Sequence, residues 1–268
     1  MSRTPPDLKV VILGATGAVG GAVVRGLLAR EPMVPLTLLG RRTVGAYDAL
    51  PVTQRAVDVF QPASYRTLID GHQAAVCTLG VGEPSKASRE EFVRVDRDAV
   101  LAFATACKER GVGHFELLGS VGANARSRQF YLRTKGELEE GLRSFNFHRL
   151  SLFRPSMILT PTNRYGVSQA VTLAVWPLLG PVLRGPARKL RGVRLERLGA
   201  AMANNLFTNG EGTQVLYWDD FERLARARDV RAKRFQGHAS RQSSQPKIRS
   251  PMSGRSSTGM AVFNSIVR

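Results

Sequence analysis

LKVVILGATGAVGGAVVRGLLAR, residues 8–30, joins an apolar run, a glycine-rich turn and an amphipathic segment. The apolar residues 8–13 follow one another without alternation, which predicts a strand buried on both faces. The apolar residues after the turn recur at helical spacing. We therefore expect a strand, a glycine turn and a helix start, and this unit organises the rest of the chain.

The three glycines of the turn have distinct physical roles. Gly14 can adopt backbone angles that a side chain would forbid, Gly17 lets the main chain approach a pyrophosphate, and Gly20 lets the helix pack close to the strand. Phosphates would bind free backbone N–H groups at the positive end of the helix dipole. A purely structural turn is the alternative. We expect a dinucleotide to contact Gly14, Thr16, Gly17, Ala18, Val19 and Gly20.

Strands and helices alternate six times in the first part of the chain. The predicted strands are residues 8–13, 34–39, 55–59, 74–78, 114–118 and 148–153, and helices are expected after the glycine turn, at 92–110 and at 128–144. This alternation predicts an α/β fold with a doubly wound parallel sheet, the Rossmann fold. A helix at 198–207, a strand at 213–218 and a helix at 219–228 would follow.

The chain divides into three regions by composition. We expect residues 1–160 to form an NAD(P)-binding Rossmann domain and residues 161–229 a small substrate or lid region packed on it. Residues 167–183 are apolar but interrupted by prolines, and residues 184–197 carry six Lys or Arg, which predicts a lid with a basic rim. A shallow membrane contact is the alternative for this region. Residues 230–268 have a composition typical of a disordered basic tail.

The formal net charge of the 268-residue chain is +18, and residues 230–268 supply eight of these charges. Because no nucleic-acid-binding motif accompanies the charge, it indicates a solvated basic surface rather than a specific nucleic-acid partner. Cys77, Cys107 and the four histidines lack metal-ligand spacing, so we expect buried free thiols and no metal site. The absence of a signal-like N-terminus and of a long apolar run favours a cytoplasmic protein without a transmembrane segment.

The ends of later strands add cofactor contacts. The second strand ends at Gly40-Arg41-Arg42, where NAD-specific proteins of this architecture usually have a carboxylate that binds the ribose 2′-hydroxyl. Arg41 and Arg42 instead suit a 2′-phosphate, so we expect NADP(H); a solvated turn is the alternative. Asp58 could meet the adenine edge or merely cap the next helix. Leu79 and Gly80 follow the fourth strand and would bring backbone near the cofactor.

Tyr131 and Lys135 are four residues apart, so a helix places both on one face. Ser120 directly follows the fifth strand, at the carboxyl edge of the sheet. A neighbouring ammonium group favours the phenolate form of a tyrosine, so Tyr131 could exchange a proton with a carbonyl or alcohol oxygen. Lys135 would also bind ribose hydroxyls, and Ser120 would hold the substrate oxygen. An ordinary amphipathic helix with a surface lysine is the alternative.

These residues resemble the atypical branch of the short-chain dehydrogenase/reductase superfamily. More narrowly, VDRDAVLAFATACKERGVGHFELLGSVGANARSRQFYLRTKGELEEGL (95–142) and LSLFRPSMIL (150–159) resemble the Tat-interacting tumour-suppressor oxidoreductase family. The resemblance covers residues 9–224. It implies a Rossmann fold that binds NADPH, a catalytic triad of Ser120, Tyr131 and Lys135, and Pro155 near the nicotinamide.

Two positions depart from the family pattern. Gly119 stands where a serine is usual, and Asp96 lies near the place of a frequent asparagine. The resemblance implies hydride transfer to a carbonyl-type small molecule. Because relatives also act as regulatory, partner-binding proteins, a non-enzymatic NADPH-binding regulator with a protein partner is the alternative.

Overall fold

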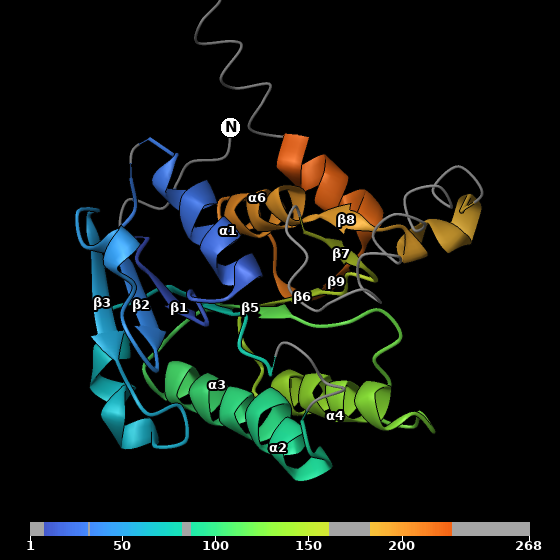
Figure 1. The fold of residues 1–268 in the computed structure, drawn as a ribbon, viewed down its shortest axis with the longest axis horizontal. Coiled ribbons are helices and arrows are strands. Elements are labelled where there is room, and N and C mark those ends of the chain that lie inside the picture. The colour runs from blue at the N-terminus through green and yellow to red at the C-terminus, as the bar shows by residue number, and fades with distance from the viewer. Residues whose placement is uncertain (1–7, 32, 82–86, 161–182, 227–268) are drawn as a thin grey trace, which may run out of the picture. The chain divides into compact units, whose positions relative to one another are not determined.

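The computed structural model describes residues 8–31, 33–81, 87–160 and 183–226. Seven parallel strands form one sheet in the order β3-β2-β1-β4-β5-β6-β9 (Figure 1). The strands are β1 (Val10–Leu13), β2 (Leu36–Gly40), β3 (Val52–Ala56), β4 (Ala74–Cys77), β5 (His114–Leu118), β6 (Arg149–Phe153) and β9 (Gly212–Leu216). The doubly wound α/β fold is therefore confirmed. Its strand order reverses between β1 and β4, which is where ligands bind in such sheets.

Helices cover both faces of the sheet. On one face lie α1 (Ala18–Leu28), α6 (Leu195–Asn205) and the helical residues 218–226. On the other lie α2 (Arg89–Val93), α3 (Ala99–Glu109) and α4 (Phe130–Ser144), as Figure 1 shows. Each face has its own apolar core, and the sheet separates the two.

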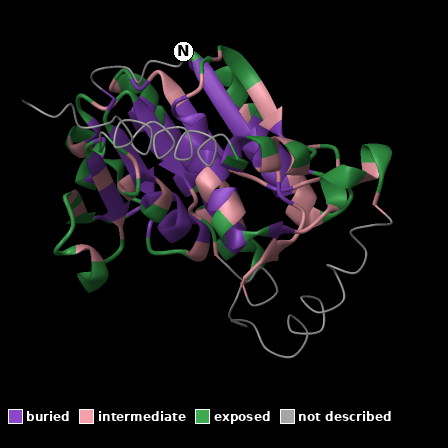
Figure 2. Ribbon diagram, turned by 90° about the horizontal axis from the view of Figure 1, so that it is seen from above, coloured by how far each residue is buried: buried purple, intermediate pink, exposed green. Residues whose placement is uncertain are grey.

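Strand β1 is central because apolar side chains point from it into both cores. Val10 and Ile12 belong to one core and Val11 and Leu13 to the other, and all four are at most 1% exposed. Figure 2 shows buried residues along the strands in the middle of the molecule. Continuous burial explains why the sequence of this strand shows no alternation of apolar and polar residues.

Strand β3 is the clearest correction to the sequence prediction. We expected it at residues 55–59, but it occupies Val52–Ala56. It is an edge strand with no fully buried residue, and its register is set by pairing with β2, from Leu36 opposite Val52 to Gly40 opposite Ala56. The buried Val57 and Val59 that suggested a later strand instead anchor the turn that follows it.

The helix expected at 92–110 begins earlier and is interrupted. The Ser88 hydroxyl accepts a hydrogen bond from the Glu91 N–H and so caps α2, which begins at Arg89. A π-helical turn, Arg94–Asp98, then joins α2 to α3. Such turns insert one residue into a helix and are frequent at functional sites.

The region expected to form a lid is described only in part. Residues 161–182 lie outside the described residues. A second, two-stranded sheet of β7 (Ile158–Leu159) and β8 (Val193–Arg194) was not predicted, because two residues are too few to show a period. Short 3₁₀ segments are Gly45–Tyr47, Pro62–Ser64, Arg66–Ile69 and Gly185–Leu190.

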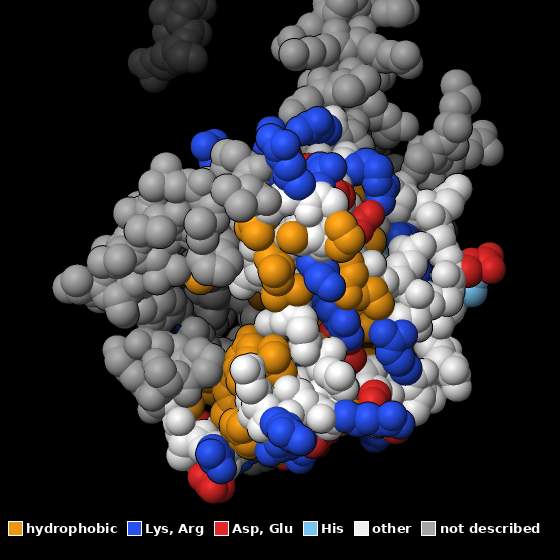
Figure 3. Space-filling model, turned by 90° about the vertical axis from the view of Figure 1, so that its right-hand side faces the viewer, with side chains coloured by type: hydrophobic (Ala, Val, Ile, Leu, Met, Phe, Trp, Pro, Cys, Tyr) orange, Lys and Arg blue, Asp and Glu red, His pale blue; other side chains and the backbone are white. Residues whose placement is uncertain are grey.

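The basic residues near β8 lie against an indole ring. The Arg188 and Arg191 guanidinium carbons are 5.4 and 4.9 Å from the ring centroid of Trp218. On the face turned to the right of Figure 1, Lys and Arg side chains alternate with hydrophobic and some acidic ones (Figure 3). Among the described residues, no helix is long and apolar enough to cross a membrane.

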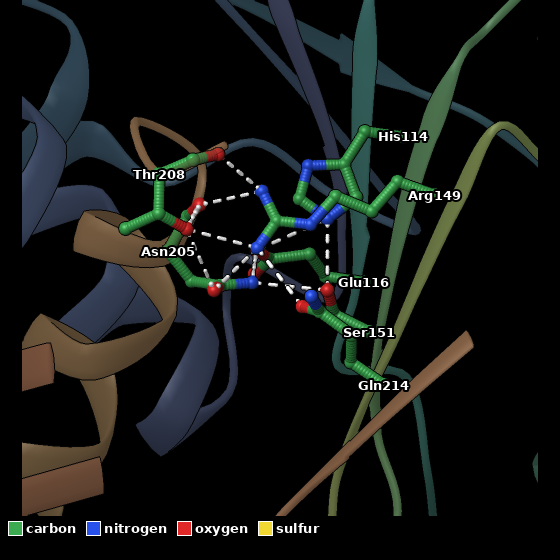
Figure 4. A network of polar contacts seen from close by, with 7 residues as sticks. All are labelled: His114, Glu116, Arg149, Ser151, Asn205, Thr208 and Gln214. Carbon is green, nitrogen blue, oxygen red and sulfur yellow. Dashed lines mark hydrogen bonds and ion pairs between the residues drawn. The ribbon is translucent and has the colours of Figure 1, made fainter. Parts of the chain in front are cut away.

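A buried polar network lies at the N-terminal ends of β5 and β6. Ligands bind such sheets at the carboxyl ends of the strands, so the network is at the other end. Arg149 donates to the Asn205 carboxamide oxygen at 2.7 Å and to the Gln214 side chain at 3.1 Å. Asn205 in turn donates to Glu116 Oε1 at 2.8 Å (Figure 4). Other members are His114, Ser151 and Thr208. The network joins the C-terminal end of α6 to the sheet.

Candidate functional site

The glycine turn between β1 and α1 has the geometry that its sequence predicts. Gly14 has a φ of +96°, a conformation that favours glycine. A Cβ at Gly20 would lie 2.3 Å from the Gly14 carbonyl oxygen, so only glycine fits where α1 meets the turn. Gly17 is the N-cap residue of α1 and offers no side-chain cap. The first N–H groups of α1 are therefore available to an anion, which fits a pyrophosphate.

A pocket of about 440 Å³ opens beside this turn. The predicted cofactor contacts Gly14, Thr16, Gly17, Arg41, Arg42, Leu79 and Gly80 line it, together with Leu13, Gly40, Val59 and Thr78. The pocket thus joins the turn after β1 to the chain that follows β2 and β4. Ala18, Val19 and Gly20 lie in the first turn of α1 rather than in the pocket lining.

Arg41 and Arg42 are exposed at the end of β2. In the described part of the chain, no ion pair engages either guanidinium group. Two unpaired cations beside the glycine turn provide a site for a further phosphate. Their position is compatible with a 2′-phosphate and offers no carboxylate for a 2′-hydroxyl.

Asp58 lies in the turn after β3 and is exposed. Its carboxylate accepts the Phe60 N–H at 2.9 Å, and its carbonyl oxygen accepts the Ser64 hydroxyl. Asp58 does not line the pocket, whereas Val59 does. Of the two roles that the sequence left open, these contacts support capping, although Asp58 caps a turn rather than a long helix.

The Thr78 side chain was not identified from the sequence but fixes the glycine turn. Its hydroxyl donates to the Gly14 carbonyl oxygen at 3.1 Å. This bond ties the end of β4 to the turn after β1. The sequence could have indicated this role of Thr78 by its position directly after a buried strand, because a hydroxyl there lies close to the switch point of the sheet.

Tyr131 and Lys135 lie one turn apart near the start of α4. Tyr131 is half-buried, with its ring centroid 5.4 Å from that of Phe92, and Lys135 is 6% exposed. The alternative of an ordinary surface lysine is therefore wrong for Lys135. A buried ammonium group needs a partner of opposite charge or an equivalent set of hydrogen bonds.

That partner is Asp96, in the π-helical turn. Lys135 Nζ lies 2.8 Å from the Asp96 carboxylate, and both side chains are almost fully buried. Burial lowers the pKa of Lys135, but the adjacent Asp96 carboxylate, together with Tyr131 and Cys77, more than offsets this effect, and the pKa is raised. Asp96 also accepts the Val81 N–H at 2.8 Å.

Ser120 is placed by the loop that follows β5. Its hydroxyl contacts the Val121 carbonyl oxygen at 3.3 Å, and its own carbonyl oxygen accepts the Ala123 N–H. The loop then lies directly on α4 at Gly136, where a Cβ would come within 2.0 Å of the Ala125 nitrogen. Gly136 therefore allows the Ser120 loop to pack on the helix that carries Tyr131 and Lys135.

Pro155 is buried and aligned with the Ser120 segment, since its carbonyl oxygen accepts the Val121 N–H at 2.9 Å. The preceding Arg154 forms an ion pair with Glu139 on α4. Glu139 is 2% exposed, so the carboxylate of this ion pair is buried. A Cβ at Gly119 would lie 3.1 Å from Glu139 Oε1, so the missing serine leaves room for this carboxylate.

None of the residues that the structure describes form a cluster of His, Cys, Asp or Glu that could hold a metal ion. Cys77 and Cys107 are buried free thiols. Burial raises the pKa of Cys77 to about 12 and also raises that of Cys107. Both thiols therefore remain protonated and add no nucleophile to the site.

Comparison with known proteins agrees with this geometry. A family model described as NAD(P)H-binding matches residues 14–150. Rat HTATIP2 is 40% identical over 155 residues, which are 56% of this chain and 63% of that protein. The mitochondrial protein fmp52 of Emericella nidulans is 29% identical over 179 residues, 65% of this chain and 77% of its own.

Among solved structures, MoeE5 in complex with UDP-glucuronic acid and NAD has a TM-score of 0.61 at 16% identity. The match covers 78% of this chain and 75% of MoeE5, and at that identity it supports the fold alone. The family resemblance stated from the sequence is confirmed by HTATIP2 and the family model. This chain belongs to the NAD(P)H-binding, HTATIP2-like family of atypical short-chain dehydrogenases/reductases.

Proposed function

We propose that the chain is an NADPH-dependent oxidoreductase that reduces a carbonyl-type small molecule. One observation carries the proposal: a buried, charged Lys135 lies one helical turn after Tyr131, on the helix against which the Ser120 loop packs. Bound NADPH would supply the hydride. The chain's own residues would bind the cofactor and manage the proton.

In this proposal each predicted residue has a separate task. The glycine turn binds the pyrophosphate, and Lys135 binds ribose hydroxyls. The Tyr131 hydroxyl gives its proton to the substrate oxygen as the carbonyl carbon is reduced, and takes one from the alcohol in reverse. Ser120 donates a hydrogen bond to that same oxygen and holds it near Tyr131.

The cofactor preference follows from Arg41 and Arg42, which line the pocket without an acidic neighbour in it. A charged hydrogen bond contributes about 1.5–3 kcal/mol, so even one of them corresponds to at least about tenfold in affinity. Fluorescence titration should give tighter binding of NADPH than of NADH. The double variant Arg41→Ala, Arg42→Ala should lose that difference, and Arg55→Ala, an exposed arginine on the neighbouring β3, should keep it. Equal affinities in the native protein would overturn the preference.

The activity is tested with Tyr131→Phe, which removes the proton donor and keeps the ring against Phe92. Native protein should oxidise NADPH with at least one member of a broad carbonyl panel. The variant should bind NADPH as the native protein does and lose that turnover. Equal, negligible oxidation by both proteins across the panel would refute an enzymatic role.

A second candidate is a non-enzymatic NADPH-binding regulator that acts through a protein partner. Two observations favour it, because both leave fewer hydroxyl groups for a substrate. The Ser120 hydroxyl donates to the Val121 carbonyl oxygen, and Gly119 contributes no hydroxyl. Both candidates predict NADPH binding, so turnover separates them. Cofactor-dependent capture of a partner by the Tyr131→Phe protein would support the regulator.

The cytoplasm is the proposed location, supported by two free thiols. The fungal relatives are named mitochondrial, so mitochondria are the alternative compartment. Cell fractionation distinguishes them. Weak peripheral membrane contact and the absence of a specific nucleic-acid partner remain predictions, checked by vesicle sedimentation and by DNA retention at rising salt.

A further inference from the structure

The Asp96 side chain connects two parts of the site that are distant in the sequence. One carboxylate oxygen accepts from Lys135 Nζ and the other from the Val81 N–H, both at 2.8 Å. Val81 directly follows Leu79 and Gly80, which line the cofactor pocket. A single buried carboxylate therefore holds both the lysine and the chain on the cofactor side of β4.

The π-helical turn explains how this carboxylate reaches both groups. Arg94–Asp98 interrupts the regular α-helix between α2 and α3, and Asp96 is its buried residue. The neighbouring Asp98 is exposed and pairs with Arg97, which also pairs with Glu137 on α4. Within this turn Asp96 is the charged residue that pairs with Lys135, whereas Arg97 and Asp98 form a separate group of ion pairs with Glu137.

The space beside Asp96 is restricted on the pocket side. A Cβ at Gly80 would lie 3.0 Å from an Asp96 carboxylate oxygen. A larger residue at position 80 would press on the carboxylate that holds Lys135. Gly80 thus permits the close approach of the pocket-lining backbone to the ion pair.

Three titratable side chains act on Lys135. They are Asp96 in the π-helical turn, Tyr131 on the same helix as Lys135, and the Cys77 thiol on β4. Burial raises the pKa of that thiol to about 12, so it is neutral. Asp96 is therefore the one carboxylate opposite Lys135 among the described residues.

We propose that Asp96 is the positioning residue of this site: its carboxylate fixes Lys135 and the Val81 backbone together, and its negative charge offsets the positive charge with which Lys135 would favour the Tyr131 phenolate. This inference rests on the proposed acid/base role of Tyr131. It adds that the charge balance of the lysine, and hence the pH range of proton transfer, is set by a residue outside the Ser-Tyr-Lys group.

Asp96→Asn tests the charge while retaining an oxygen that can accept the Val81 N–H. The Asp96 carboxylate lies 2.8 Å from Lys135 Nζ, and a charge within about 4–6 Å shifts the titration of a neighbouring group by about 1–3 units. Removing the negative charge makes proton loss from the Lys135–Tyr131 pair easier. The upper limb of the pH profile for NADPH oxidation should therefore move to lower pH by at least about one unit. Asp98→Asn, in the same turn but exposed, is the matched control and should leave the profile in place.

Asp96→Ala removes the tether as well as the charge. It should weaken NADPH binding more than Asp96→Asn does, because only the alanine variant frees the Val81 N–H next to the pocket. NADPH titration by fluorescence needs no turnover, and so it remains informative if the proposed reaction fails. Thermal unfolding in saturating NADPH identifies variants that do not fold.

A third measurement removes the dependence on enzyme activity. Ultraviolet difference titration of the native protein against Tyr131→Phe isolates the phenolate of this one tyrosine. Repeating the pair in an Asp96→Asn background should move the midpoint to lower pH. An unchanged midpoint together with equal NADPH affinities of the asparagine and alanine variants would overturn the inference. A shifted midpoint without turnover on any substrate would refute the proposed function and leave the role of Asp96 standing.

Discussion

Glu116 provides a quantitative test of the buried network at the start of β5 and β6. Its side chain is fully buried, and one carboxylate oxygen, Oε2, has no hydrogen-bond partner. Burial raises its pKa from 4.5 to about 8, and the Asn205 hydrogen bond and the Arg149 charge only partly oppose this shift. The folded protein therefore binds a proton at Glu116 that the unfolded chain has already released.

The direction in which stability changes with pH follows from proton binding at Glu116. Between pH 4.5 and about 8 the folded state holds more protons at Glu116 than the unfolded state, so its contribution to stability falls as the pH rises through this window. At about 1.4 kcal/mol per pKa unit, the loss is about 1 kcal/mol at pH 5, about 3 at pH 7 and almost 5 at pH 9. Glu116→Gln resembles the protonated side chain and should avoid this loss.

Urea unfolding of the native protein and of Glu116→Gln across this pH range measures the difference directly. The free energy of unfolding of the variant minus that of the native protein should increase as the pH rises, by about 3–4 kcal/mol from pH 5 to pH 9. Glu211→Gln, which removes an exposed carboxylate, should show no such trend. A constant difference, or one that reverses because ionised Glu116 pairs with Arg149, would refute the reasoning.

Three further predictions concern the glycine turn, the Ser120 loop and the thiols. Gly20→Ala places a Cβ 2.3 Å from a backbone carbonyl oxygen and should weaken NADPH binding and cost at least about 1–3 kcal/mol in urea unfolding. Gly21→Ala is the control, because the nearest atom to its Cβ is the movable Tyr47 hydroxyl at 3.3 Å and the nearest backbone atom is at 3.6 Å; equal losses in both variants would contradict this explanation. Gly136→Ala should displace the Ser120 loop and reduce turnover more than NADPH affinity; unchanged turnover would show that the loop does not depend on this contact. Cys77 and Cys107 should resist alkylation in the folded protein at mildly alkaline pH and react after unfolding, as mass spectrometry would show; rapid labelling of the folded protein would contradict their burial.

The fold was predictable because its signals are local. The buried run at β1, the glycine turn and the alternation of strands with helices predicted a doubly wound parallel sheet, and the structure adds the order of its strands. β5 was predicted at the residues that it occupies, His114–Leu118. The edge strand β3 was displaced because its position depends on pairing with β2, which no local pattern records.

The candidate site was predictable where it depends on residue type at fixed spacing. The glycine turn and the Tyr131–Lys135 pair follow this rule, and the two arginines were identified from their position at the end of a predicted strand. Asp96 and Glu139 did not, because their roles come from partners distant in the sequence, Lys135 and Arg154. A regular helix pattern also cannot reveal a π-helical turn, which changes the face on which later residues lie.

The most direct test of the account is calorimetric titration of the folded native protein with NADPH and then with NADH. The glycine turn, the free N–H groups of α1 and the Arg41–Arg42 pair predict saturable binding of NADPH and weaker binding of NADH. Circular dichroism before and after the titration checks that the protein is folded. No heat from either coenzyme at concentrations up to about 1 mM would contradict the claim that this chain binds a pyridine dinucleotide.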